Sequence, residues 1–245
     1  MKNFILNFSL ILLCIGCTLN AYSQNRDGYS KKNIETGSTT FNYHESSVKS
    51  KSVVLIFHDW FGVSDLSYEI GDFLLDKGFD VIIMDLYKGK SAKNNQEAGA
   101  LMNSIDQENV WNYIDEVVEA SSEKYENIIL WGFSLGTVPA SNTAIKHNQI
   151  IDGLILFYGN VTQDKNELSK ITFPALMVMG AKDNPQGAIN FFNDVNAASG
   201  TANLFIYPNA RHAFAQKLFN AGGNYNEKAK KASLNVVADF LEGIE

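Results

Sequence analysis

One stretch decides the fold of this chain: N-I-I-L-W-G-F-S-L-G-T, from Asn127 to Thr137. Residues 128–131 are wholly apolar, as expected of a central strand that is buried on both faces. Gly132-Phe133-Ser134-Leu135-Gly136 follows directly and matches G-x-S-x-G, and residues 139–147 are compatible with a helix. A strand, a tight turn and a helix in this order are the context that a nucleophile elbow requires. The stretch therefore predicts that Ser134 stands above a sheet edge, at a helix N-terminus whose N–H groups can hold an oxyanion.

The first 23 residues have the pattern of a secretory signal peptide. Lys2 precedes a short, interrupted apolar run from Phe4 to Cys17, and Ala21-Tyr22-Ser23 offers a small-residue cleavage site. We expect cleavage after Ser23 and export to the periplasm or the cell exterior. Lipoprotein processing at Cys17 is the alternative. A retained membrane anchor is disfavoured because the apolar run is too short and too interrupted.

Charge and cysteine content narrow the possible partners. The formal net charge of the 245-residue chain is −7, and it becomes one unit more negative once Lys2 is removed with the signal. An acidic chain without a basic cluster argues against nucleic acid and anionic membrane surfaces as partners. Both cysteines, Cys14 and Cys17, lie in the signal. The mature domain therefore has no disulfide, no thiolate nucleophile and no cysteine-based metal site.

Residues 24–38 are polar, and we expect them to form a flexible leader. After this leader, segments with the pattern of strands alternate with segments with the pattern of helices. Strands are predicted at 39–44 (an edge strand), 53–57, 79–84, 128–131, 152–158, 175–179 and 203–207. Helices are predicted at 65–77, 95–104, 107–120, 139–147, 186–198 and 225–241. Such alternation predicts one α/β domain over residues 39–245, with a mostly parallel central sheet flanked by helices and ligands at the carboxyl edge. The segment 159–173 is too short for a large lid domain.

A nucleophilic Ser134 needs a base, and the base needs an orienting acid. Of the four histidines, His212 follows the elbow at the carboxyl end of the last predicted strand, in the chain order Ser, acid, His. His147 ends the elbow helix, where it more naturally caps that helix. The alternative for His212 is an ordinary surface histidine.

Asp183 is the favoured acid because it comes just past the carboxyl end of the strand 175–179. Asp164, after the preceding strand, is the reserve. Asp152 opens a strand and so lies at the wrong edge, and Asp194 sits inside a helix. The alternative for Asp183 is a plain turn-forming aspartate.

The loop His58-Asp59-Trp60-Phe61-Gly62, after the strand 53–57, is expected to complete an oxyanion hole. The predicted donors are the backbone N–H groups of Trp60 and Leu135. We interpret His58 as a brace for this loop, whereas Asp59 either orients a substrate or ties the loop to its neighbours. Phe61, Phe133, Tyr158 and Phe214 are candidates, with Trp60, for an apolar substrate-binding wall, although such aromatics are equally common in cores.

Six pieces of the sequence, in chain order, resemble the dienelactone hydrolase family of the α/β-hydrolase superfamily. They are His58-Asp59-Trp60-Phe61-Gly62, Asp85-Leu86-Tyr87, Gly132-Phe133-Ser134-Leu135-Gly136, Phe157-Tyr158-Gly159, Gly180 to Asp183, and His212-Ala213-Phe214. The resemblance implies the α/β-hydrolase fold and hydrolysis of an ester or lactone. The chain departs from the family pattern where Ser134 replaces the usual cysteine nucleophile and where Asp59 stands at a position that is commonly glutamate.

The resemblance also bears on the substrate. Family members that process dienelactone hold its carboxylate with two arginines. In this chain the corresponding places hold Gly89, with Lys88 and Lys90 beside it, and Gln216. We therefore expect hydrolysis of some other ester rather than of dienelactone.

These observations predict an exported serine hydrolase that cleaves a small-molecule ester or lactone through an acyl-enzyme. No metal-ligand spacing and no glycine-rich phosphate loop appears in the sequence, so we expect neither a metal nor another cofactor. Two alternatives stay open. One is a non-catalytic binding protein on the same fold, with Ser134 as a structural turn residue, and the other is a thioesterase or amidase that uses the same triad.

Overall fold

The computed structural model of the chain describes residues 26–198, 200–218 and 224–244. The predicted signal peptide, with both cysteines, lies outside the described residues. Among the described residues, no helix combines the length and the apolar character that crossing a bilayer requires.

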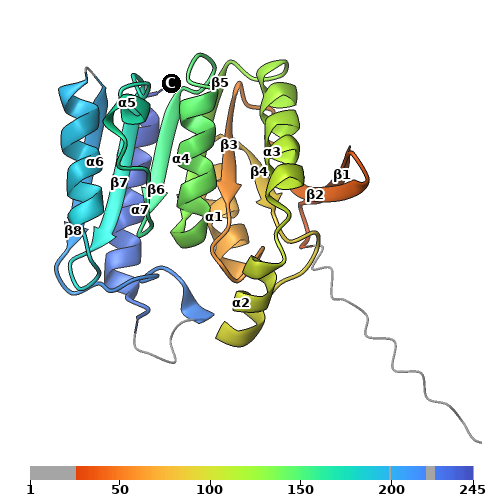
Figure 1. Cartoon of the computed structure of the whole chain (residues 1–245), viewed down its shortest axis with the longest axis horizontal. Coiled ribbons are helices and arrows are strands. Elements are labelled where there is room, and N and C mark those ends of the chain that lie inside the picture. Colours follow the sequence, from red (N-terminus) through yellow and green to blue (C-terminus); the bar gives the residue numbers. More distant parts are fainter. Residues whose placement is uncertain (1–25, 199, 219–223, 245) are drawn as a thin grey trace, which may run out of the picture.

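A mostly parallel sheet forms the centre of the molecule (Figure 1). Its described strands are β1 (Ser30–Thr36), β2 (Thr39–Ser46), β3 (Ser52–Phe57), β4 (Asp80–Asp85), β5 (Asn127–Phe133), β6 (Gly153–Phe157), β7 (Pro174–Gly180) and β8 (Thr201–Tyr207). They lie in the order β1-β2-β4-β3-β5-β6-β7-β8. The β1–β2 and β2–β4 pairs are antiparallel, and all later pairs are parallel. The predicted α/β architecture is confirmed.

Helices cover both faces of the sheet. The described helices are α1 (Asp65–Asp76), α2 (Asn95–Asn103), α3 (Gln107–Ser122), α4 (Thr137–Lys146), α5 (Lys165–Leu168), α6 (Gln186–Ala197), α7 (Glu227–Glu242) and the short 3₁₀ helix η1 (Ser134–Gly136). Helices α3, α4 and α6 lie on one face and α1 and α7 on the other, while α2 lies at the carboxyl ends of the strands (Figure 1). Ion pairs join neighbours on the same face, Lys230 of α7 to Glu69 of α1 and Lys146 of α4 to Asp115 of α3.

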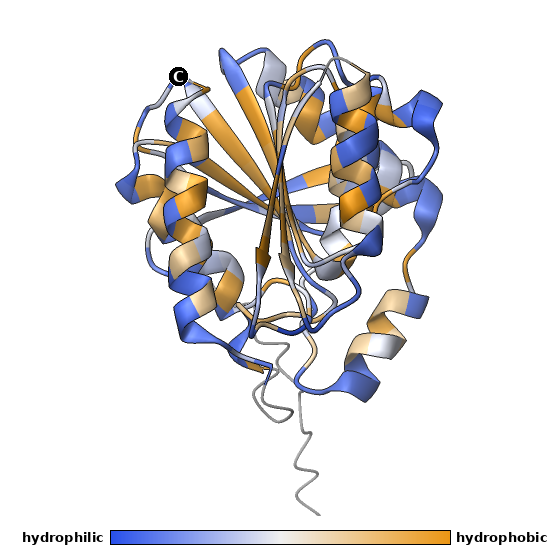
Figure 2. Ribbon diagram, turned by 90° about the vertical axis from the view of Figure 1, so that its left-hand side faces the viewer, coloured by the Kyte–Doolittle hydropathy of each residue, from blue (hydrophilic) through white to orange (hydrophobic). Residues whose placement is uncertain are grey.

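The core follows from the apolar strands. Every residue of β3, β4 and β6 is buried, so these strands read as continuous hydrophobic runs rather than as alternating ones. Figure 2 shows the hydrophobic strands between helices whose hydrophobic sides face them. Several helices begin at a residue whose side chain accepts a backbone N–H of the first turn: Asn94, Asp106, Asp164 and Asn226.

Two sequence predictions at the start of the domain are wrong. Residues 30–36, assigned to the flexible leader, form β1, and the strand predicted as an edge strand, β2, lies between β1 and β4. β1 escapes detection because it is largely exposed and polar, so it has no hydrophobic alternation. Helix α5 was also not predicted, and it is the one helix described in the segment 159–173. No large lid domain is inserted there.

Candidate active site

The turn after β5 holds Ser134 in a strained backbone conformation. Its φ is +50°, in the left-handed region that a serine rarely adopts, and η1 and α4 follow immediately. The flanking glycines make this turn possible. A Cβ on Gly132 would lie 2.5 Å from the carbonyl oxygen of Gly136, and a Cβ on Gly136 would lie 2.5 Å from that of His58. The strand, the helix and the loop after β3 therefore pack backbone against backbone around the serine.

The loops after β7 and β8 bring Asp183 and His212 together. The N–H of Ala181 donates to the carbonyl of Tyr207 at 2.9 Å, and the N–H of Lys182 donates to that of Ala210 at 3.0 Å. These two bonds tie the loop of Asp183 to the loop of His212. The positions of the two side chains are thus fixed by backbone contacts between adjacent parallel strands.

Ser134, His212 and Asp183 form a continuous hydrogen-bonded line. Ser134 Oγ lies 2.8 Å from His212 Nε2, and His212 Nδ1 lies 2.8 Å from Asp183 Oδ2. A carboxylate only accepts hydrogen bonds, so Nδ1 donates to Asp183, and in a neutral imidazole this leaves Nε2 as the acceptor that faces the serine hydroxyl. Both Ser134 and His212 are half-buried and so remain within reach of a ligand.

A pocket of about 550 Å³ opens beside Ser134 and His212. Trp60 and Leu135, the predicted oxyanion donors, lie in its wall. The other described lining residues come from the loops after β4 and β6, from α2, α3 and α4, and from the connection between α2 and α3: Leu86, Met102, Ile105, Gln107, Val110, Trp111, Val138, Pro139, Gly159 and Asn160. Among the residues that the structure describes, no group of three or more His, Cys, Asp or Glu side chains is placed to hold a metal ion.

Of the five aromatic residues predicted to form a substrate-binding wall, Trp60 lines the pocket and the other four do not. Phe61, Phe133, Tyr158 and Phe214 are each at most 2% exposed, and none of them lines the pocket. Phe133, Tyr158 and Phe214 pack against one another in the main core, and Phe61 packs in a smaller buried cluster with Ala92 and Ala98. Sequence reasoning missed Trp111, a half-buried tryptophan of α3 that lines the pocket. Its signal in the sequence is its position off the face of the helix that carries the apolar residues Tyr113, Ile114 and Val117.

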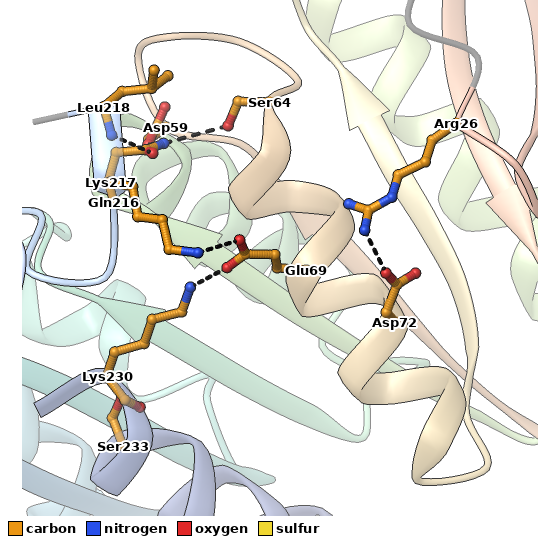
Figure 3. A network of polar contacts seen from close by, with 10 residues as sticks. All are labelled: Arg26, Asp59, Ser64, Glu69, Asp72, Gln216, Lys217, Leu218, Lys230 and Ser233. Atoms are coloured by element: carbon orange, nitrogen blue, oxygen red, sulfur yellow. Dashed lines mark hydrogen bonds and ion pairs between the residues drawn. The ribbon is translucent and has the colours of Figure 1, made fainter. Parts of the chain in front are cut away.

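Asp59 holds the loop after β3 and does not face the pocket. It is 2% exposed; Oδ1 accepts the N–H of Phe61 at 2.9 Å, and Oδ2 accepts Nε2 of Gln216 at 2.8 Å. The same Gln216 nitrogen lies 3.3 Å from the hydroxyl of Ser64 (Figure 3). Burial raises the pKa of Asp59 to about 6, against the opposing effect of its hydrogen bonds. Of the two roles considered for Asp59, the contacts are those of a residue that ties the loop to its neighbours.

His58 braces the same loop from the other side. Its Nδ1 lies 2.5 Å from the carbonyl oxygen of Asp59, and its Nε2 accepts the N–H of Leu86 at 3.1 Å. Burial lowers the pKa of His58 to about 4, so the ring is neutral near pH 7. His58 thereby links the ends of β3 and β4, as the sequence interpretation held.

The remaining candidates lie away from the serine. His147 ends α4 and its Nε2 lies 2.7 Å from Oδ1 of Asp115. Asp164 caps α5, Asp152 accepts the N–H of Ile128 at 2.8 Å, and Asp194 pairs with Lys165 at 3.0 Å. None of these four residues, the reserve acid Asp164 included, is among the described residues that line the pocket.

The chain is similar to several known hydrolases, either in sequence or in fold. A protein of Aquifex aeolicus (strain VF5), assigned by name as a carboxymethylenebutenolidase, is 29% identical over 175 residues, which are 66% of this chain and 75% of that protein. The structure of a dienelactone hydrolase-like promiscuous phosphotriesterase from metagenomic libraries is 15% identical, with 88% of this chain and 98% of that chain covered and a TM-score of 0.74. An esterase of Pyrococcus furiosus is also 15% identical, with coverage of 88% and 92% and a TM-score of 0.64.

At such low identity the two solved structures show a shared fold and no more. The sequence itself matches the dienelactone hydrolase family over residues 40–244. Because that match spans most of the chain, the protein belongs to the dienelactone hydrolase family and is a hydrolase that acts on ester bonds.

Proposed function

We propose that this protein is an exported serine hydrolase that cleaves a small ester or lactone through an acyl-enzyme formed on Ser134. One observation carries the proposal. The strained Ser134 is hydrogen-bonded to His212, and His212 to Asp183, at the mouth of a pocket large enough for a small molecule. This is the geometry by which a hydroxyl, a poor nucleophile on its own, becomes reactive near neutral pH.

The first step forms the acyl-enzyme. Ser134 Oγ bonds to the carbonyl carbon of the ester while its proton passes to His212 Nε2, and the carbonyl π electrons move to the oxygen. Asp183 stabilises the imidazolium that results. When the tetrahedral intermediate collapses, the bond to the alcohol oxygen breaks and the imidazolium gives that oxygen its proton.

The oxyanion needs hydrogen-bond donors in place before it forms. We assign this role to the backbone N–H groups of Leu135, directly after the serine, and of Trp60, on the loop that Asp59 and His58 hold. Water then attacks the acyl-enzyme by the same route, with His212 as base, and releases the acid. A lactone yields a single hydroxy acid because its alcohol stays attached to the acyl group.

Export is part of the proposal and rests on the pattern of residues 1–23. The N-terminal residue of protein recovered after export tests it. A start at Gln24 supports cleavage after Ser23, whereas a lipid-modified start at Cys17 supports the alternative.

The catalytic proposal is tested by labelling and turnover together. The mature protein should react with a fluorophosphonate probe and cleave p-nitrophenyl acetate, and Ser134→Ala should lose both properties. Ser122→Ala, at the exposed end of α3, is the matched control and should keep both. A folded wild-type protein that takes no label and cleaves no short ester would favour the non-catalytic binding protein. Labelling without ester turnover would favour a thioesterase or amidase.

A further inference from the structure

We infer that the natural substrate is an uncharged ester with an apolar chain on one side of the scissile bond, and that this chain lies in the pocket between α2, α3 and α4. The inference rests on the proposed function, because it places the scissile carbonyl at Ser134. It goes further in naming the class of substrate and the side chains that select it.

Most of the described side chains that line the pocket are apolar. Met102, Ile105, Val110, Trp111 and Val138 form much of the lining, and no Asp, Glu, Lys or Arg is among the described residues that line it. A carboxylate moved into such a site loses its hydration and gains no ionic partner, whereas a hydrocarbon chain is stabilised there.

Two lysines on loops near the site, Lys88 and Lys217, have partners elsewhere in the molecule. The Lys88 ammonium lies 4.9 Å from the centroid of the Phe41 ring. Lys217 pairs with Glu69 of α1 at 2.7 Å (Figure 3). Neither lysine is among the described lining residues. A substrate carboxylate therefore finds no ammonium group in this part of the pocket wall.

Gln216 is also unavailable to a substrate. It is 2% exposed; its Nε2 donates to Asp59 at 2.8 Å, and its Oε1 accepts the N–H of Leu218 at 3.1 Å. Gly89, the other place where dienelactone-processing relatives carry an arginine, has φ +83° and donates its N–H to Asp85 at 2.6 Å. Neither position offers a cation to a substrate carboxylate. At both positions, the residue that replaces the arginine of those relatives is held by hydrogen bonds within the protein.

Two exposed apolar side chains mark the open side of the pocket. Met102 of α2 is 41% exposed and Val138 of α4 is 42% exposed, and both line the pocket. An apolar chain bound there would remove this surface from water, and burial of apolar surface contributes favourably to the free energy of binding.

The test measures kcat/KM of the mature protein in two series of esters. The acyl series runs from p-nitrophenyl acetate through butyrate to hexanoate, and the alcohol series compares ethyl acetate with hexyl acetate. We expect kcat/KM to rise at least tenfold along one of the series, because burying one more methylene group can raise kcat/KM by up to about fourfold. Mono-p-nitrophenyl succinate should react at least tenfold more slowly than the butyrate ester.

A matched pair of variants assigns the selectivity to the pocket. Val138→Lys places a cation in the wall and should lower the butyrate-to-succinate ratio by tenfold or more. Val48→Lys changes a valine of similar exposure, 48%, beside Asp80 at the opposite edge of the sheet, and should leave the ratio unchanged. Trp111→Ala tests the same wall without introducing a charge. This variant should reduce the gain in kcat/KM from the shortest to the longest ester. Thermal unfolding of each variant confirms that it is folded.

The outcomes separate this inference from the proposed function. Hydrolysis of acetate esters with no gain along either series, or a preference for the succinate ester, overturns the inference and leaves the serine hydrolase intact. Equal ratios in Val138→Lys and Val48→Lys overturn the assignment to this pocket. A wild-type protein that cleaves none of these esters overturns both.

Discussion

Asp59 and Gln216, 157 positions apart in the chain, are joined by a 2.8 Å hydrogen bond from Gln216 Nε2 to Asp59 Oδ2 (Figure 3). The bond connects the loop after β3, which carries Trp60, to the loop that follows His212. Both side chains are buried. This contact therefore holds the loops of Trp60, the proposed oxyanion donor, and His212, the proposed base, in fixed positions relative to each other. It involves neither Ser134 nor a described residue of the pocket lining.

This contact has a measurable pH dependence. Burial raises the pKa of Asp59 from 3.8 to about 6 in the folded protein, so between about pH 4 and pH 6 the folded state holds this proton more tightly than the unfolded chain does. The contribution of Asp59 to the free energy of unfolding must then fall as the pH rises through that window. Above it, the contribution is constant.

Asp59→Asn removes that titration. The free energy of unfolding of the variant minus that of the wild type should rise by on the order of 1–3 kcal/mol between about pH 4 and pH 6 and then level off. Urea denaturation at several pH values measures the difference. His58 and Asp85 also titrate abnormally, and their contributions cancel in the subtraction. A difference that stays constant across the window would show that Asp59 has an ordinary pKa.

His212→Ala should lower kcat/KM for p-nitrophenyl acetate by roughly a thousandfold or more, because the serine then lacks its base. His147→Ala is the matched control. His147 also contacts an aspartate, Asp115, at 2.7 Å, but at the end of α4 and away from the pocket. We expect its activity within about twofold of wild type. Near-normal turnover in His212→Ala would place the base elsewhere.

Asp183→Asn should reduce turnover by on the order of a hundredfold or more, because the amide no longer holds the imidazole in the orientation and tautomer that the reaction needs. Asp164→Asn should keep full activity and stability, since asparagine caps a helix about as well as aspartate and Asp164 caps α5. Steady-state kinetics on both variants decides between the two acids. A large loss in Asp164→Asn would reverse the assignment.

Two buried tyrosines should respond differently to loss of the hydroxyl. The hydroxyl of Tyr158 is buried and has no hydrogen-bond partner among the described residues. The hydroxyl of Tyr113 donates to the carbonyl of Asn42 at 2.7 Å and accepts the N–H of Asp85 at 3.2 Å. Tyr158→Phe should leave the free energy of unfolding unchanged or raise it, whereas Tyr113→Phe should lower it by on the order of 1–3 kcal/mol. Equal losses in the two variants would imply that Tyr158 has a polar partner.

The central sheet could be predicted from the sequence because its strands are buried on both faces. Residues 53–57, 128–131 and 175–179 are continuous apolar runs, and each lies within an observed strand. The polar strand β1 could not be predicted, because its pairing with β2 is made by backbone groups rather than by a hydrophobic face. Its existence depends on the partner strand and not on its own residue pattern.

The positions of Ser134, Asp183 and His212 followed from topology, since the carboxyl ends of neighbouring parallel strands meet at one edge. The residues that line the pocket could not be predicted from topology in the same way. Whether an aromatic side chain lines a cavity or the core depends on which way its element turns, and Phe133 and Trp111 illustrate the two cases. Residue type alone treats them alike, so the substrate class could be argued only from the structure.

The backbone at Ser134 restricts what evolution can place there. At φ +50° a β-branched residue is a severe outlier, because its second Cβ substituent collides with the adjacent main chain. Threonine is therefore barred from the turn although it carries the same hydroxyl. Of the side chains that end in a hydroxyl or thiol one carbon from the backbone, serine and cysteine alone fit. An ancestral exchange between oxygen and sulfur chemistry at this turn is accordingly a single-atom change that leaves the backbone undisturbed.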